Sequence, residues 1–187
     1  TGGIMKTLSI RMGLALLLGS VLTLGVAFAG PGGAGGAMFG SLHGAPLSDR
    51  FPGLDAAMQG GLGYGVDGNG TKIGGWGMSL WEDEPYSGYA GGFGGTVHGL
   101  EQQILGPLHL DITALVGIGW ASFDQDVSGL AGYVQLDAGI GVAVFNWFMV
   151  QAYVGATAIP VLQPGPAFRH TGISYSSGVR FLWGWFG

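Results

Sequence analysis

The segment from Leu130 to Val144 alternates between two kinds of side chain. One parity is apolar: Val134, Leu136, Ala138, Ile140, Val142 and Val144. The other parity is small or polar: Tyr133, Gln135, Asp137, Gly139, Gly141 and Ala143. Successive side chains of a β-strand point to opposite faces of its sheet, so this period of two predicts a strand with one apolar face.

Similar alternation recurs along the chain and predicts eight strands. They cover Gly36–Gly44, Ala57–Val66, Thr71–Trp81, Tyr86–Ile104, Leu108–Trp120, Leu130–Val144, Trp147–Ala158 and Thr171–Phe186. Tight connections alternate with longer polar or Pro-rich ones, as in membrane barrels. A helix is the alternative over Val142–Val161, but the polar residues of that stretch follow the strand parity. Two points stay open: whether Gly36–Gly44 is the first strand, and whether the fourth segment splits at Gly94-Gly95.

Glycine content and a deficit of charge indicate what kind of sheet these strands form. The chain has 41 glycines in 187 residues and only 9% charged residues, against about 25% in a typical soluble domain. Glycine costs roughly 1 kcal/mol relative to alanine inside a helix, whereas glycine alternating with large apolar residues suits a narrow, tightly curved sheet. We expect the small residues to point into a lumen and the large ones outward, including those of Met58–Val66 and Lys72–Trp81.

A sheet with one apolar face and few charges needs lipid or a second sheet against that face. In lipid an open sheet would leave unpaired edge amides, so the sheet must close. The predicted fold is therefore all-β, an antiparallel up-and-down transmembrane β-barrel of about eight strands; a secreted β-sandwich is the alternative. Aromatic side chains are expected at both membrane interfaces. The candidates are Trp76, Trp81, Trp120, Trp147, Trp183 and Trp185.

The first thirty residues have the features of an export signal. Lys6 and Arg11 precede an apolar run from Met12 to Phe28, and Ala27-Phe28-Ala29 fits a small-x-small cleavage site. We therefore expect residues 1–29 to be upstream residues plus a signal peptide, residues 30–35 a flexible Gly-rich mature N-terminus, and residues 36–187 the barrel. A transmembrane anchor is the alternative for the apolar run.

The last predicted strand contains a polar-x-Gly-x-x-aromatic-x-aromatic pattern. Its defining residues are Ser176, Gly178, Phe181 and Trp183. This pattern resembles the C-terminal assembly signal of bacterial outer-membrane barrels, and the mature chain is similar to the small OmpA/OmpX-type barrels. The resemblance implies a location in the bacterial outer membrane, contact with lipid and lipopolysaccharide, recognition by the barrel-assembly machinery, and a monomer.

The parity of the strands places several polar side chains inside the predicted barrel. They are Asp111, Asp137 and Arg180, with His109, Gln135, Gln151 and Tyr153. Charges buried in a narrow lumen are costly unless they are paired. We therefore predict that Arg180 pairs with Asp137 or Asp111.

Several functional classes have no support in the sequence. Six Lys and Arg residues and a net charge of −5 argue against nucleic-acid binding. There are no cysteines, and the four histidines show no metal-binding spacing, so no metal and no cofactor are expected. The leading hypothesis is a non-enzymatic barrel with a structural or surface-interaction role and a lumen filled by polar side chains. The alternatives are a narrow pore or small-solute carrier, and a lipid-modifying barrel enzyme using His170 near Ser174 and Ser176.

Overall fold

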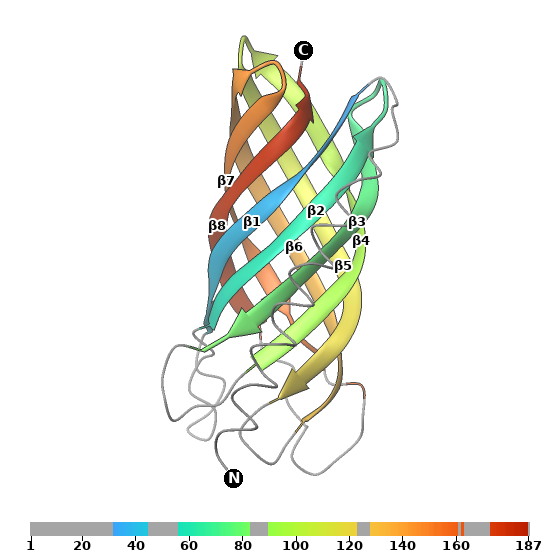
Figure 1. Cartoon of the computed structure of the whole chain (residues 1–187), viewed down its shortest axis with the longest axis vertical. Coiled ribbons are helices and arrows are strands. Elements are labelled where there is room, and N and C mark those ends of the chain that lie inside the picture. The colour runs from blue at the N-terminus through green and yellow to red at the C-terminus, as the bar shows by residue number, and fades with distance from the viewer. Residues whose placement is uncertain are drawn as a thin grey trace, which may run out of the picture.

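The chain folds as one closed antiparallel barrel of eight strands. The computed structural model describes residues 32–44, 56–82, 90–122, 128–160, 162 and 173–186. The strands are β1 (Gly32–Gly44), β2 (Ala56–Val66), β3 (Thr71–Trp81), β4 (Ala90–Leu105), β5 (Leu108–Ser122), β6 (Ser128–Phe145), β7 (Phe148–Ala158) and β8 (Ile173–Trp185). Each strand pairs with the next, and β1 pairs with β8 to close the sheet (Figure 1). The predicted eight-stranded antiparallel barrel is confirmed. Within the described residues, no helix has the length and apolar character needed to cross a membrane.

Both open points about the strands are resolved. The first strand exists, and β4 runs without a break through Gly94-Gly95. The expectation of a flexible segment at 30–35 was wrong for residues 32–35, which already belong to β1: Gly33 lies opposite Gly65 of β2 and Trp185 of β8. A methyl group on Gly33 would lie 2.8 Å from the carbonyl oxygen of Tyr64, so glycine lets the backbones approach closely there.

Three tight turns join strands at one end of the barrel, as the sequence predicted. They comprise residues 67–70, 106–107 and 146–147. Gly70 and Gly106 adopt positive φ angles of 84° and 51°, which glycine reaches without the steric penalty of a side chain. Most residues joining strands at the opposite end, like the predicted signal segment at 1–29, lie outside the described residues.

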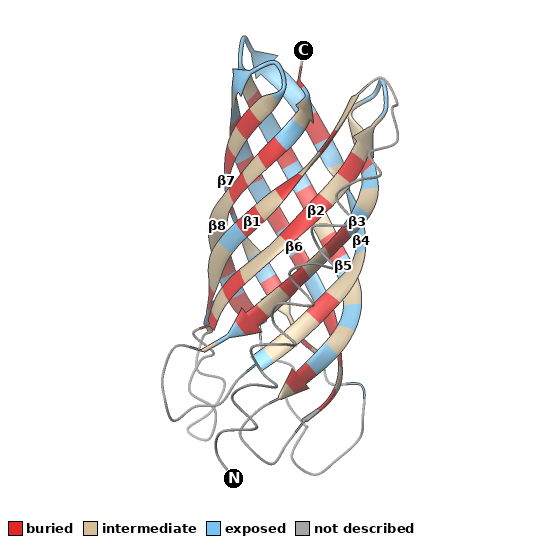
Figure 2. Ribbon diagram, viewed as in Figure 1, coloured by how far each residue is buried: buried red, intermediate tan, exposed pale blue. Residues whose placement is uncertain are grey.

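Burial alternates along every strand, but not always in the predicted sense (Figure 2). In β5, β6 and β7 the outward parity is mostly Leu, Ile, Val and Ala, and the inward parity is mostly polar or small, as expected. In β2 and β3 the assignment was wrong. The large apolar side chains point inward there and are buried: Met58, Leu62, Tyr64, Trp76, Met78 and Leu80. The outward parity of these two strands is mostly small or polar, with glycine at 61, 63, 65, 75 and 77.

The reversal has a simple cause, since the lumen must be filled. The indole of Trp76 is only 7% exposed and packs on Tyr133 of β6, with ring centroids 4.9 Å apart. Phe93 of β4 reaches the same Tyr133 ring at 5.3 Å. A methyl group on inward-facing Gly117 would come within 2.9 Å of the Trp76 ring. Bulky residues on one wall therefore face glycines on another, which gives the close packing of a protein interior.

Candidate functional site: the polar interior of the barrel

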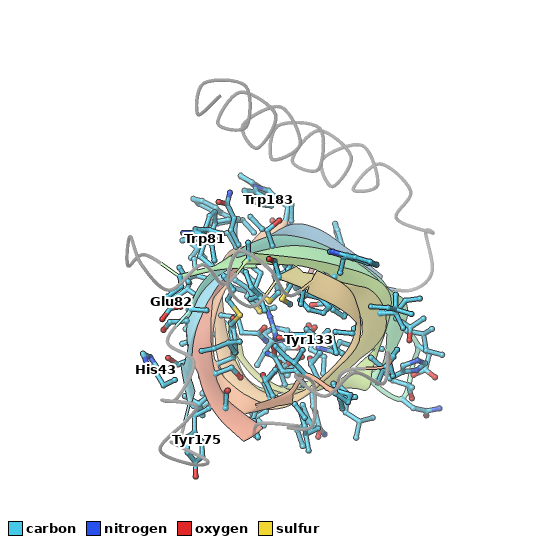
Figure 3. The ribbon with its side chains drawn as sticks, turned by 90° about the horizontal axis from the view of Figure 1, so that it is seen from below. His43, Trp81, Glu82, Tyr133, Tyr175 and Trp183 are labelled. Atoms are coloured by element: carbon cyan, nitrogen blue, oxygen red, sulfur yellow. The ribbon has the colours of Figure 1, made fainter. Side chains whose placement is uncertain are left out.

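Every charged side chain on the described strands points into the barrel. These residues are Lys72, Glu101, Asp111, Asp137 and Arg180, and none is more than 9% exposed. The view along the barrel shows Tyr133 pointing into the interior, while His43, Trp81, Tyr175 and Trp183 project outside the wall (Figure 3). Burying charge in this way requires that the charges find partners.

Arg180 of β8 is the centre of the larger group of charges. Its Nη2 donates to Asp137 Oδ2 at 2.6 Å, and its Nη1 donates to Gln151 Oε1 at 3.0 Å and Asp111 Oδ1 at 3.4 Å. Its guanidinium carbon also lies 4.2 Å from the ring centroid of Tyr153. The structure thus brings Arg180 to both carboxylates that the sequence proposed as partners. Register explains the contact with Gln151, which lies directly opposite Arg180 on β7.

Lys72 of β3 supplies the second positive charge. Its Nζ donates to Asp111 Oδ2 and to Thr113 Oγ1, and it lies 4.7 Å from the ring centroid of Tyr64. Lys72 is not among the predicted lumen residues, because it shares the parity of Trp76, which was predicted to face lipid. A lysine on that parity was the available signal, since a charged side chain facing the middle of a bilayer is costly. The lysine therefore indicates that the whole parity of β3 that contains Lys72 and Trp76 faces the interior.

The remaining predicted polar residues line the interior. Gln135 donates from Nε2 to Asp137 Oδ2 at 2.9 Å and accepts from the Tyr133 hydroxyl. Gln135, Gln151 and Tyr153 are each at most 2% exposed. The network thus extends over β3, β5, β6, β7 and β8.

A second, smaller group lies nearer the tight-turn end. The Tyr64 hydroxyl donates to Glu101 Oε2 at 2.7 Å, and Glu101 Oε1 lies 3.4 Å from Nδ1 of His109. The His109 ring packs edge-on against Phe186, with centroids 6.1 Å apart. His109 was predicted to face the lumen and does so, whereas Glu101 was not singled out because the alternation in its segment is irregular.

The predicted interfacial aromatics divide into five exposed residues and one exception. Trp81, Trp120, Trp147, Trp183 and Trp185 are between 38% and 59% exposed and lie toward the two ends of the barrel. Trp76 was wrongly assigned, since it lies in the interior and donates from Nε1 to the Thr96 carbonyl at 3.1 Å. In the assembly-signal-like segment, Ser176 and Gly178 share the inward parity of Arg180, and Phe181 and Trp183 face outward.

The site is therefore a set of buried polar side chains in which Lys72 and Arg180 pair with Asp111 and Asp137. Among the described residues, no group of three or more His, Asp or Glu side chains is placed to hold a metal ion. His170, proposed for a lipid-modifying enzyme, lies outside the described residues, and Ser174 and Ser176 are buried inside the barrel. Comparison of the chain with protein-family models, curated proteins and solved structures gave no match.

Proposed function

We propose that the protein is a non-enzymatic β-barrel of a bacterial outer membrane, with a structural or surface-interaction role and a lumen closed by its own side chains. The distribution of charge carries the proposal. All five charged side chains on the described strands face inward, while the outward parity of β5, β6 and β7 is mostly aliphatic. A barrel in water would gain from the reverse arrangement, whereas one in lipid requires this one.

Two further observations support the membrane setting. Exposed tryptophans lie toward both ends of the barrel, where interfacial aromatic girdles occur in membrane barrels. The strands also close, so no sheet edge is left with unpaired amides. A closed lumen is expected because an eight-stranded barrel is only wide enough for its side chains to fill.

A matched pair of outward substitutions tests the membrane setting. Leu136 lies near the middle of β6 and is 58% exposed, and Val144 lies near its tight-turn end and is 51% exposed. In a bilayer, Leu136→Arg should cost about 2–4 kcal/mol and Val144→Arg about 0–1 kcal/mol, because the cost depends on depth. The free energy of unfolding in lipid vesicles measures both. Equal costs, together with a barrel that stays soluble without detergent, would refute the proposal.

A narrow pore is the second candidate, and buried polar atoms favour it. Several interior atoms lack a hydrogen-bond partner among the described residues: Asp137 Oδ1, Gln151 Nε2, Tyr153 Oη, Thr157 Oγ1, Ser176 Oγ and Arg180 Nε. All belong to β6, β7 and β8, and buried polar atoms of this kind commonly bind water. Planar-bilayer recording of the refolded protein separates the candidates. A closed barrel should give no discrete channel openings, whereas a conducting path along β6, β7 and β8 should give them.

A further inference from the structure

The outer wall of the barrel differs from one side to the other. On β5 and β6 the outward residues are bulky and aliphatic, as at Ile112, Val116 and Leu136, which are between 46% and 58% exposed. On β2 and β3 they are mostly small or polar, with glycine at 61, 63, 65, 75 and 77. A bilayer presents the same hydrocarbon to every side of a barrel, so this difference indicates that the side formed by β2 and β3 has a neighbour other than lipid.

The barrel itself does not require glycine on this side. A methyl group on Gly63, Gly75 or Gly77 would come no closer than 3.6 Å to atoms of the other strands, which is an ordinary contact. On the inward residues Gly36 and Gly95 the same methyl group would collide with a backbone carbonyl of the next strand. The three outward glycines, here called the glycine surface, leave bare backbone on the wall. Small residues at contacts between membrane segments let two backbones approach closely.

Two polar side chains lie beside the glycine surface. Thr96 and His98 are exposed on the outer wall near the middle of β4, and Thr96 Oγ1 lies 3.1 Å from His98 Nε2. Thr96 is directly opposite Gly75 of β3. Polar side chains at this depth are costly in hydrocarbon, and in membrane proteins they pair with other groups. The pair is therefore a second, independent sign that this side is covered by a polar partner.

The Thr96–His98 pair has one hydrogen-bond donor and one acceptor to spare. With a neutral imidazole, whichever of the two groups donates in the contact between them, the hydroxyl and Nδ1 together still supply one donor and one acceptor. Among the described residues, no other side chain bonds to this pair. A two-fold contact joins the same surface of both subunits. Such a contact can bring the spare donor of each pair to the spare acceptor of the other.

We propose that the side of the barrel formed by β2, β3 and β4 is a contact between two copies of this chain in the membrane. The glycine surfaces of the two copies pack against each other, and the Thr96–His98 pair of each copy bonds to that of the other. The described outward residues of these strands include no Asp, Glu, Lys or Arg, so the surface does not repel its own copy. The inference rests on the proposed membrane setting, because water would solvate the two polar side chains. It departs from the monomer that the resemblance implies.

Energy transfer between labelled barrels in lipid vesicles tests the hydrogen bonds of this contact. The chain has no cysteine, so Asn146→Cys in a tight turn gives one labelling site per copy. Transfer in this parent protein should fall as the lipid-to-protein ratio rises. Thr96→Val removes the hydroxyl and keeps the shape, so the dimer should weaken about 10-fold, the effect of losing two hydrogen bonds between membrane segments. Thr96→Ser keeps the hydroxyl and should associate like the parent.

A bulky residue on the glycine surface tests the close approach. Gly75→Leu should fold, because its added Cβ has room, but its side chain should hold the two backbones apart and weaken the dimer more than about 10-fold. Ala138→Leu is the matched control. Ala138 is exposed near the middle of β6, on the aliphatic side of the wall, and its enlargement should leave transfer unchanged. Urea unfolding establishes that each variant is folded.

Flotation with the vesicles shows whether the barrel has inserted. An inserted parent protein with no transfer beyond that of randomly placed barrels would overturn the contact and leave the membrane setting intact. Undiminished transfer in folded Gly75→Leu and Thr96→Val would overturn it as well. A barrel that does not float with the vesicles refutes the membrane setting and the contact with it, so the two failures are distinguishable.

Discussion

Removing Arg180 should destabilise the barrel more than removing its closest partner, Asp137. In Arg180→Met, Asp111 keeps Lys72, but Asp137 keeps only the amide of Gln135. An uncompensated buried charge of this kind costs about 3–5 kcal/mol. In Asp137→Asn, Arg180 still contacts Asp111, Gln151 and the ring of Tyr153. The loss is then one charged hydrogen bond, about 1.5–3 kcal/mol.

The double variant Arg180→Met/Asp137→Asn isolates the interaction. Lys72, Arg180, Asp111 and Asp137 sum to zero charge, each single variant makes this sum −1 or +1, and the double variant restores it to zero. We therefore expect the free energy of unfolding of the double variant to fall by about 2 kcal/mol less than the sum of the two single losses. A coupling of this size is within the range for directly contacting residues.

Equilibrium unfolding in urea, in lipid vesicles and followed by tryptophan fluorescence, gives the four free energies. Leu182→Met is the matched control, because Leu182 lies two residues along β8, faces inward and is fully buried. This volume-conserving change should cost less than about 1.5 kcal/mol. Strict additivity of the two single losses, or a cost below about 1 kcal/mol for Arg180→Met, would refute the assignment of Arg180 as the shared partner of both carboxylates.

Three other predictions follow from the packing and the turns. Trp76→Ala should cost about 3–5 kcal/mol, because a buried aromatic side chain is lost. Trp120→Ala should cost less, because Trp120 is 53% exposed. If urea unfolding ranks the two losses the other way, Trp76 does not lie in the interior. Gly74→Ala should destabilise the barrel by about 1–3 kcal/mol, since the added methyl group would collide with the Gly63 carbonyl. A methyl group on Gly65 would meet nothing within 4 Å, so Gly65→Ala should change stability by no more than about 0.5 kcal/mol. Equal losses for the two variants would count against this packing. Backbone N–H groups of Thr71 and Asn69 donate to Asp67 Oδ1 and lower the pKa of that carboxyl. Its contribution to stability is therefore present above its unfolded pKa of about 3.9 and lost as the pH falls through the lower folded value, so unfolding of Asp67→Ala and wild type should differ at pH 7 and converge in strong acid.

The alternation in the sequence predicts the eight strands, but it does not predict for every strand which face points into the barrel. A period of two identifies strands wherever it occurs, and in β6 the polar member Asp137 also indicates which face is inside. In β2 and β3 glycine alternates with large apolar residues, and both parities are compatible with lipid. The choice between them depends on the volume that the lumen must hold, which is a property of the closed barrel and not of any one strand. In these two strands Lys72 is the one local signal of the inward face, since a lysine facing the middle of a bilayer is costly.

The ion-pair partners across the lumen were also predictable only in part, because they too depend on the closed barrel and not on any one strand. Parity placed Arg180, Asp111 and Asp137 on the inside, but the contact of Lys72 with Asp111 depends on the register of three strands, β3, β4 and β5. Glu101 follows Val97 and Gly99 on the inward parity of β4, in a strand whose pattern is irregular from sequence alone.

The network also bears on how a glycine-rich barrel fixes its register. Strands rich in glycine specify their pairing weakly, because few side chains distinguish one register from another. A slip of β8 by two residues keeps every side chain on its own face but moves Arg180 by about 7 Å along the strand. That displacement would separate it from Asp137, which now lies 2.6 Å away. The buried ion pairs would then be broken at a cost of about 3–5 kcal/mol, so the slipped barrel is disfavoured. We therefore expect the double variant Arg180→Met/Asp137→Asn to recover stability without recovering a single register, and a second set of backbone amide resonances in β8 would reveal the slipped form.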